Sequence, residues 1–564
     1  MPISPAVSED YSDMIYIYPA LTENLPAELS QFFPQIVDSQ FAILHIPLSK
    51  GLNTVAETGY ASIPKLFTYV STVSLEESGI LSAQFQPVLN LTGNGILLGF
   101  LDSGIDYTHP AFRNPDGSTR ILGIWDQTDQ TGTPPDSFTY GTEYTEGQIN
   151  QALFSANPYD LVPERDLNGH GTAVAGIACG TVQEESDFYG AAPRSGILFV
   201  RLKPAKQYLR DYFLIPERAD AYQENDLMLG IRYLVQTARR LQKALVICIT
   251  LGTNQGSHTG QSPLEEVIIS AQKLSGIYAV SAAGNEAGKG HHFYKKFNYE
   301  GESTMVELLV DSETRGFTVE LWADSPEIYN IGILSPGGEI IEPVPFRAKN
   351  SQEFTFLLEN TKVTLDYEAV EITSGSFVAL IRFSTPSTGL WRLQIVNRVF
   401  LNGLVHLWLP ITGLSDPGIR FYSPSPDTTL VIPSCAEPVI TVSAYNAYNH
   451  TLFINSSRGY TRNGIIKPDF AAPGVNVTAP SVSSVSGLAP FTGSSAASAI
   501  TAGAACLLIE WGLHRSEPRI FSSTELKSLF LFGTVRNPAL YYPNREWGYG
   551  TMNVYQIFES MIRP

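Results

Sequence analysis

Apolar residues recur along the chain in two patterns, and the way these alternate predicts the main fold. Runs that are apolar almost throughout lie at residues 95–102, 195–203, 244–252 and 276–286. Residues 225–243 carry apolar side chains at helical spacing instead, among them Leu227, Ile231 and Leu234. Continuous apolar strands that alternate with helices form a parallel sheet covered on both faces. This region is therefore predicted to be an α/β unit.

The pattern changes between about residues 300 and 430, where short runs alternate apolar and polar positions. Turn residues separate these runs, and the runs lie at 304–311, 317–324, 353–360, 363–372, 377–384, 390–396 and 404–410. Short strands of this kind are typical of an antiparallel β-sandwich, here expected to be a jelly-roll. A continuous apolar run returns at 439–446. The sandwich is therefore predicted to be an insertion within one α/β domain.

The first 70 residues have a third character, with a strand-like run at 40–49 and a short helix expected within 26–39. They are predicted to form a small α+β unit ahead of the main domain. The expected divisions of the chain are 1–70 for this unit, 71–295 and 431–564 for the two parts of the α/β domain, and 296–430 for the inserted sandwich.

Charge and apolar content narrow the functional classes. The chain of 564 residues has a formal net charge of −19, and an acidic surface repels nucleic acid and anionic membranes. No apolar run reaches the roughly 20 residues of a bilayer span, so no membrane partner is expected. The N-terminal sequence has neither the basic nor the apolar region of a signal peptide.

Four cysteines, widely spaced and within or beside apolar segments, indicate small buried side chains in a reducing compartment. They are Cys179, Cys248, Cys435 and Cys506. An intracellular protein is expected.

Two polar residues end predicted strands, where an open parallel sheet binds its ligands. Asp102 ends the run 95–102, and Asn285 lies at the end of the run 276–286, directly after Gly284. Taken singly, each is more simply interpreted as an ordinary turn residue. Alternatively, the carboxylate can support a neighbouring base, and the amide can donate to a developing oxyanion.

Two further segments place polar residues at helix starts. His170 lies between two glycines ahead of a run of small residues, where a neutral imidazole able to act as a base is favoured over a cation. Ser494 and Ser495 follow Gly493 and begin another run of small residues. Either serine can be a simple N-cap, and one of them can be a nucleophile held at a helix start.

Together these segments resemble the signature segments of the subtilisin-like serine proteases. The matching stretches are LDSGID at 101–106, GHGTAVAGI at 169–177, AAGN at 282–285 and GSSAASA at 493–499. Their order along the chain, Asp then His then Ser, is the order of that family. The resemblance covers about residues 70–290 and 430–560.

The resemblance implies a serine endopeptidase with a catalytic triad. Ser495 would be the nucleophile, and His170 the general base and then the acid toward the leaving amine. Asp102 would orient the imidazole and support its charge. Asn285 and the backbone N–H of Ser495 would form the oxyanion hole.

The same resemblance implies substrate-binding residues around the nucleophile. One set is expected to add its backbone as a strand to an extended peptide: Thr250, Leu251 and Gly252. Another set is expected to form a wall of a roomy, mainly apolar first pocket: Ala282, Ala283 and Gly284. The chain departs from the family at Ser494, Ala496 and Ala499, where threonine, methionine and proline are common. These changes are expected to alter the shape of the site and to leave its chemistry intact.

The inserted β region and the stretch GNEAGKGHHF at 284–293 resemble the Csp germination proteases of spore-forming clostridia. That likeness implies that residues 1–70 are a propeptide that assists folding, is cut off autocatalytically between about Phe67 and Ser71, and stays docked. It also implies a protein substrate, a spore cortex-lytic pro-enzyme.

Two alternatives stay open: a pseudoprotease that senses a germinant, and a housekeeping intracellular subtilase. The intact Asp102, His170 and Ser495 favour an enzyme over the first of these. His291 and His292 are expected to anchor the insertion, since no acidic or cysteine partner stands at ligand spacing. No cofactor is predicted, and no acidic cluster is assigned to the structural calcium that is common in the superfamily.

Overall fold

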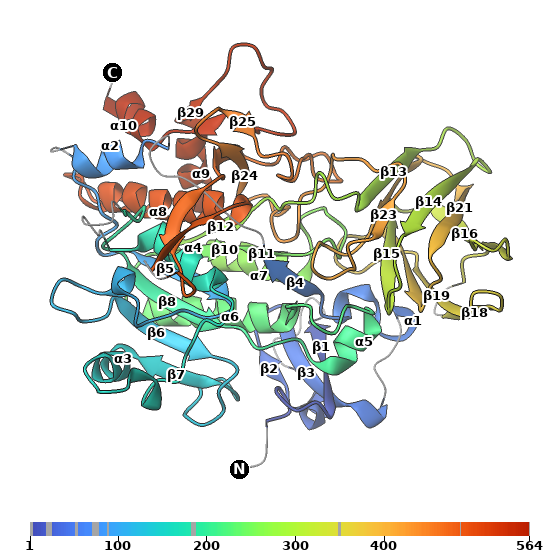
Figure 1. Ribbon diagram of the computed structural model, residues 1–564, viewed down its shortest axis with the longest axis horizontal. Coiled ribbons are helices and arrows are strands. Elements are labelled where there is room, and N and C mark those ends of the chain that lie inside the picture. The colour runs from blue at the N-terminus through green and yellow to red at the C-terminus, as the bar shows by residue number, and fades with distance from the viewer. Residues whose placement is uncertain are drawn as a thin grey trace.

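A sheet of 11 strands forms the centre of the fold (Figure 1). The computed structural model describes residues 4–18, 25–50, 55–69, 78–86, 89–181, 188–347, 351–484 and 487–562. The strands of this sheet are β5 (Leu97–Asp102), β6 (Ile121–Asp126), β7 (Thr142–Thr145), β8 (Gly196–Arg201), β10 (Leu245–Ile249), β12 (Ile277–Ala282), β24 (Ile440–Asn446), β25 (Thr451–Leu452), β26 (Phe470–Pro473), β29 (Thr534–Val535) and β30 (Thr551–Met552). They follow the order β29-β30-β26-β24-β12-β10-β5-β8-β6-β7, with β25 beside β24. Every pair from β30 to β6 is parallel, and the pairs β29-β30, β6-β7 and β24-β25 are antiparallel.

Helices cover both faces of this sheet, as the continuous apolar strands predict. Alternate side chains of β5 face opposite layers: Leu98 packs in the core with α4 (His170–Cys179) and α8 (Ser494–Leu513), whereas Leu97 packs with α6 (Glu224–Arg240) and α7 (Pro263–Gln272). The predicted helix over 225–243 is confirmed as α6. The remaining helical segments are α1 (Val55–Thr58), α2 (Ile80–Phe85), α3 (Glu146–Leu153), α5 (Gln207–Tyr212), α9 (Ser523–Phe532), α10 (Val554–Ile562), and the 3-10 turns Ala27–Phe32, Leu48–Lys50, Tyr60–Ser62, Pro110–Phe112 and Pro158–Asp160.

Helix α8 corrects the expectation that no segment is long and apolar enough to cross a membrane. Within its 20 residues, an 18-residue window reaches a mean hydropathy of 1.5, and 89% of that window is buried inside the fold. Because protein surrounds the helix on nearly all sides, its apolar character is that of a core helix. Its small residues let it approach its neighbours closely: a Cβ added at Gly503 would lie 2.4 Å from the Cβ of Ala191.

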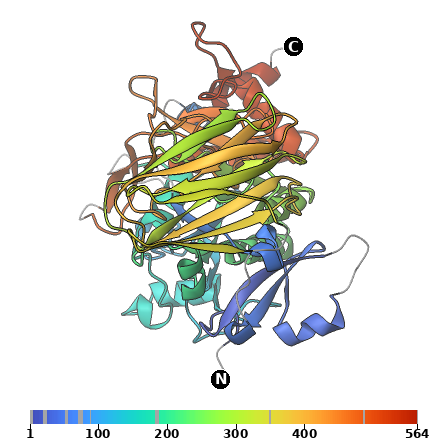
Figure 2. The same cartoon turned by 90° about the vertical axis from the view of Figure 1, so that its right-hand side faces the viewer.

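Between β12 and β24 the chain forms two antiparallel sheets that share one apolar core (Figure 2). One contains β13 (His292–Lys296), β15 (Gly316–Ala323), β18 (Gln352–Phe356), β19 (Thr361–Glu368), β20 (Phe377–Ser384) and β22 (Leu404–Trp408); the other contains β14 (Ser303–Val310), β16 (Ile328–Leu334), β17 (Ile340–Val344), β21 (Gly389–Val399) and β23 (Ile419–Phe421). We call residues 292–421 the inserted sandwich. Its first strand begins at His292, inside the range 71–295 expected for the α/β domain.

The N-terminal unit contains a three-stranded antiparallel sheet. It is formed by β1 (Tyr11–Ile17), β3 (Phe41–Pro47) and β2 (Gln35–Ile36), in that order. The helix expected within 26–39 is instead a short 3-10 turn followed by β2. Apolar side chains of this sheet, including Ile15 and Ile43, share a core with α6 and α7. The unit therefore packs on the α6–α7 face of the large sheet.

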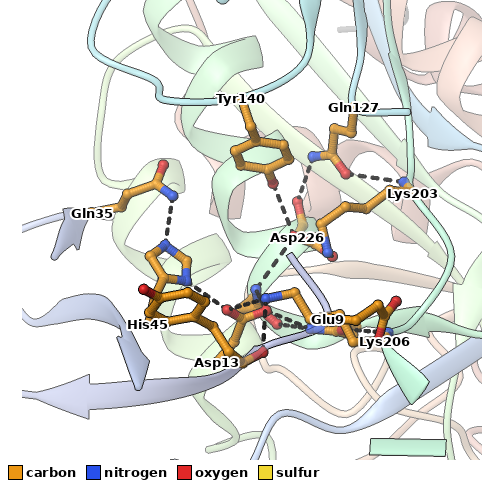
Figure 3. Close-up of polar contacts among 12 residues, drawn as sticks. Glu9, Asp13, Gln35, His45, Gln127, Tyr140, Lys203, Lys206 and Asp226 are labelled. Atoms are coloured by element: carbon orange, nitrogen blue, oxygen red, sulfur yellow. Dashed lines mark hydrogen bonds and ion pairs between the residues drawn. The ribbon is translucent and has the colours of Figure 1, made fainter. Parts of the chain in front are cut away.

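A buried polar cluster joins the N-terminal unit to the α/β unit (Figure 3). The Asp13 carboxylate accepts hydrogen bonds from His45 Nδ1 at 2.5 Å, Lys206 Nζ at 3.0 Å and Gln223 Nε2 at 2.9 Å. Burial acts to raise the pKa of Asp13, but the charges of Lys206 and His45 more than offset this and hold it well below its usual value. A buried charge that lost these partners would be strongly destabilising, so the cluster fixes how the unit docks.

The four cysteines are all buried and free in the structure. Within the part of the chain that the structure describes, no group of three or more His, Cys, Asp or Glu side chains is arranged to hold a metal ion.

Two buried histidines pair where the sandwich meets the α/β unit. His292 Nε2 lies 3.0 Å from His406 Nδ1, and both rings stack near Trp408. One ring must donate and the other accept, so at most one of the two can carry a positive charge. Burial lowers the pKa of His292 to about 3 and that of His406 well below its usual value.

This pair predicts a loss of stability in mild acid. In the unfolded chain both imidazoles titrate near pH 6.5, so the unfolded state binds more protons below that pH. The free energy of unfolding therefore falls as the pH falls from about 6.5 toward 4, by about 1.4 kcal/mol per pH unit for each histidine. Thermal unfolding of wild type should show a larger fall in Tm between pH 7 and pH 5 than the double variant His292→Phe, His406→Phe.

The exposed His514 supplies the control, because His514→Gln should keep the wild-type dependence on pH. Buried carboxyls such as Glu265, whose pKa burial raises to about 7, act in the opposite direction in every variant. The test therefore compares the fall in Tm between pH 7 and pH 5 across the variants, in which the contribution of the carboxyls is the same. Equal falls in Tm for wild type and the double variant would contradict the prediction.

Candidate active site

The Asp102 carboxylate lies at the carboxyl end of β5 and is almost fully buried, with 1% of its surface exposed. His170 Nδ1 lies 2.9 Å from both of its oxygens. The backbone N–H of Ser103 donates to Oδ1 at 2.8 Å, and the hydroxyl of Thr250 donates to Oδ2 at 2.9 Å. These contacts satisfy a buried charge and fix the plane of the imidazole.

His170 is the first residue of α4, and a second carboxylate organises this helix start. Asp166 accepts hydrogen bonds from the backbone N–H groups of Gly169 and Thr172, both at 2.8 Å. It also accepts from the hydroxyls of Thr172 and Ser103, at 2.8 Å each. Sequence reasoning missed Asp166, because it lies three residues before the N-cap Gly169, outside the positions that a capping motif uses.

Ser495 lies in the first turn of α8, with its side chain buried and its hydroxyl donating to the Thr250 carbonyl at 3.3 Å. Thr250 therefore contacts both the nucleophile candidate and Asp102, through different atoms. The sequence assigned Thr250 only a backbone role in substrate binding. Gly493 precedes the helix at φ 141°, a conformation that L side chains rarely adopt.

Asn285 and Ser494 hold each other beside the start of α8. The backbone N–H of Ser494 donates to Asn285 Oδ1 at 3.0 Å, and the Ser494 hydroxyl accepts from the backbone N–H of Gly284 at 3.1 Å. Because the amide oxygen of Asn285 is engaged, its nitrogen is the end that can donate to a substrate oxyanion. Ser494 is thus a positioning neighbour of Asn285.

A short sheet beside Ser495 contains part of the N-terminal region. Strand β4 (Leu66–Tyr69) pairs between β11 (Leu251–Gly252) and β9 (Tyr222–Gln223), antiparallel to both. Tyr69 is opposite Leu251, next to Thr250. Leu251 and Gly252, which were expected to pair with a substrate peptide, therefore pair with β4 of the same chain.

The two expected pocket walls lie on either side of Val431. A Cβ added at Gly252 would lie 2.4 Å from Val431 Cγ2, and one added at Gly284 would lie 2.6 Å from Cγ1. The N–H of Val431 donates to the carbonyl of Ala283 at 3.0 Å, and Ala282 and Ala283 are both buried. Val431 thus occupies space that the sequence suggested was a roomy slot, and no sequence pattern placed it there.

His291 has an acidic partner that the sequence analysis did not expect. Its Nδ1 lies 2.6 Å from Glu286 Oε2, and Glu286 Oε1 accepts from the backbone N–H of Thr412. Burial acts to raise the pKa of Glu286, but His291 and the Thr412 contact lower it overall. Since Thr412 follows β22 of the inserted sandwich, this pair ties the loop after Asn285 to the insertion.

The parallel sheet, the helix-start His170 and Ser495, and the strand-end Asp102 define a subtilisin-like α/β protein. A family comparison agrees: the subtilase family matches residues 93–309 and 416–550, more than half of the chain. The chain belongs to the subtilase family.

Among solved structures, the Clostridium perfringens CspB protease is similar over most of both chains. It is 32% identical, with a TM-score of 0.76, over 86% of this chain and 98% of that one. An intracellular serine protease of Paenibacillus polymyxa is 25% identical over 47% of this chain and 64% of its own length. The Arabidopsis thaliana subtilisin-like protease SBT2.2 is 28% identical over 34% of this chain, a match that spans 22% of the plant protein.

The contacts of Thr250 generate a prediction for the site. Thr250→Val keeps the shape of the side chain and removes the donor to the buried Asp102 carboxylate. A hydrogen bond to a charged group is worth about 1.5–3 kcal/mol, so reaction with a fluorophosphonate probe should slow by roughly 10-fold or more.

The matched control is Thr501→Val, because the Thr501 hydroxyl donates to the Ala497 carbonyl within α8 and to the Met552 sulfur on β30. Its probe reaction should stay close to wild type. Unchanged labelling of Thr250→Val, with circular dichroism showing a folded protein, would count against a role for this hydroxyl in the site.

Proposed function

We propose that the protein is a serine endopeptidase that cuts its own chain after β4 and then activates another protein by limited proteolysis. The observation that carries this proposal is strand β4, which pairs with β11 next to Ser495 as an extended substrate would. The similarity to the CspB protease over 86% of this chain supports it.

In the proposed mechanism, Ser495 Oγ attacks the carbonyl carbon of the scissile peptide while His170 takes the hydroxyl proton. Asp102 holds the imidazole and stabilises its positive charge. Asn285 Nδ2 and the Ser495 N–H donate to the oxyanion. His170 then gives the proton to the leaving amine, and water, activated by the same imidazole, hydrolyses the acyl-enzyme.

The expected cut between Phe67 and Ser71 extends outside the described residues, which end at Tyr69 before a gap at 70–77. Because Phe67 and Tyr69 are paired along β4, we place the cut beyond them, after residue 70. We assign residues 1–70 as the propeptide and interpret the inserted sandwich as a jelly-roll. The buried Asp13 cluster supports a propeptide that stays docked after the cut.

By the likeness to Csp proteases, we propose that the protein substrate is a spore cortex-lytic pro-enzyme. A pseudoprotease is the competing class, and the hydrogen-bonded Asp102–His170 pair, connected to Ser495 through Thr250, favours the enzyme.

The proposal predicts self-cleavage that depends on Ser495. Recombinant wild type should run as two fragments on a denaturing gel and elute as one species from a sizing column. N-terminal sequencing of the large fragment should begin at residue 71. Ser495→Ala should run as one intact chain, and Ser498→Ala, one helical turn further on, should still self-cleave. An intact wild-type chain that no fluorophosphonate probe labels would overturn the proposal.

The position of Val431 predicts a preference for small side chains before the cut. Val431→Gly removes the side chain between the two walls, so hydrolysis of peptides ending in Phe should rise by about 10-fold or more relative to peptides ending in Ala. Val370→Gly, at a position 62% exposed on the sandwich, should leave this ratio unchanged. The same Phe-to-Ala ratio in Val431→Gly and wild type would refute this role.

A further inference from the structure

The segment that leads into β4 crosses a junction between the inserted sandwich and the α/β unit (Figure 1). Tyr60 lies at this junction with 3% of its surface exposed. Its hydroxyl donates to Glu320 Oε2 at 2.6 Å, its backbone N–H donates to Glu368 Oε2 at 2.8 Å, and its ring packs edge-on against Trp322 at 4.9 Å between centroids. All three partners belong to the sandwich, so the insertion holds one aromatic side chain upstream of the proposed cut.

Lys65 is held next to Tyr60 by the other side of the junction. Its Nζ lies 3.8 Å from Glu224 Oε2 on α6, 2.9 Å from the Tyr60 carbonyl and 4.3 Å from the centre of the Tyr60 ring. The backbone N–H groups of Lys65 and Leu66 donate to Glu224 Oε2 at 3.1 Å and Gln255 Oε1 at 2.9 Å. The α/β unit therefore holds a buried lysine and the backbone that follows it.

The carboxylates that face Tyr60 and Lys65 make this junction acidic, and Glu320 is also held by contacts that do not involve the segment leading into β4. Glu320 Oε2 also accepts from Trp322 Nε1 at 3.0 Å and from the Gly256 N–H at 2.9 Å, which orient it independently of Tyr60. Burial raises the pKa of both Glu320 and Glu224. The bound lysine supplies positive charge beside these carboxylates. A preformed acidic and aromatic site of this kind fits a peptide that carries an aromatic residue and a lysine.

We propose that Glu320, Trp322 and Glu368 of the sandwich, with Glu224 and Gln255 of the α/β unit, form an extended substrate site. This site binds an aromatic residue and a lysine upstream of the cut in protein substrates, just as it binds Tyr60 and Lys65 of this chain. After the cut, the Asp13 cluster keeps the N-terminal unit docked while residues 58–69 leave the junction, and a substrate that binds in the place of β4 continues back through it. The inserted sandwich thereby selects substrates far from the reacting bond. This inference rests on the proposed protease function.

The test compares two p-nitroanilide peptides, one of residues 58–70 and one of residues 66–70, with full-length enzyme. The long peptide reaches the site, and the short one does not. The kcat/KM of the long peptide should exceed that of the short peptide by at least about 10-fold. Long peptides with Tyr60→Ala or Lys65→Ala should lose most of this advantage, and these variants do not depend on folding of the enzyme.

On the enzyme, Glu320→Gln should reduce the ratio of long to short peptide, and the surface variant Glu307→Gln on β14 should keep it. Equal kcat/KM for both peptides would overturn the inference. So would an enzyme that cuts its own chain and neither peptide, because the site would then serve only its own segment. Failure of the proposed function is distinguishable, since wild type would then stay intact on the gel and unlabelled by the probe.

Discussion

The buried carboxylate of Asp102 is the constraint around which the site is arranged. A charge with 1% of its surface exposed must be surrounded by donors, and three separate segments provide them: Ser103 after β5, His170 at the start of α4, and Thr250 after β10. Thr250 also positions Ser495, because its carbonyl accepts a hydrogen bond from the Ser495 hydroxyl. The carboxyl ends of β5 and β10 and the starts of α4 and α8 therefore meet at one point of the sheet.

A second common element joins the three parts of the chain. One apolar cluster takes side chains from the N-terminal unit, the α5 region and the sandwich; its members include Val55, Tyr60, Leu66, Leu209, Phe213, Trp322, Trp408 and Val431. Tyr60 and Val431 both belong to this cluster. The segment that leads into β4 therefore packs in the same core as the side chain between the two expected pocket walls. The sandwich is thus coupled to the site through a close-packed core, in which a change of volume is felt by neighbouring side chains.

The large sheet, its helices and the insertion could be predicted because each leaves a local pattern: continuous apolar strands, helical spacing and short alternating runs. Asp102, His170, Asn285 and Ser495 could be named as candidates because each follows a strand or begins a helix within a recognisable motif. Val431 and the Tyr60–Glu320 contact could not, since they depend on residues about 150 to 260 positions apart that no local pattern connects. The 3-10 turn at Ala27–Phe32 was missed because its pattern does not differ from that of a short helix.

The position of the inserted sandwich in the chain also determines the order in which the candidate site residues are synthesised. Asp102, His170 and Asn285 leave the ribosome before it, and Ser495 leaves after it. Domains fold as units during translation, starting from the N-terminus. A nascent chain can therefore dock its N-terminal unit and complete the sandwich before Ser495, the proposed nucleophile, has been synthesised. Helix α8, which carries Ser495 through the middle of the sheet, must enter after most of its neighbours are in place. The order of the segments along the chain thus delays the self-cleavage proposed above until α8 has been synthesised.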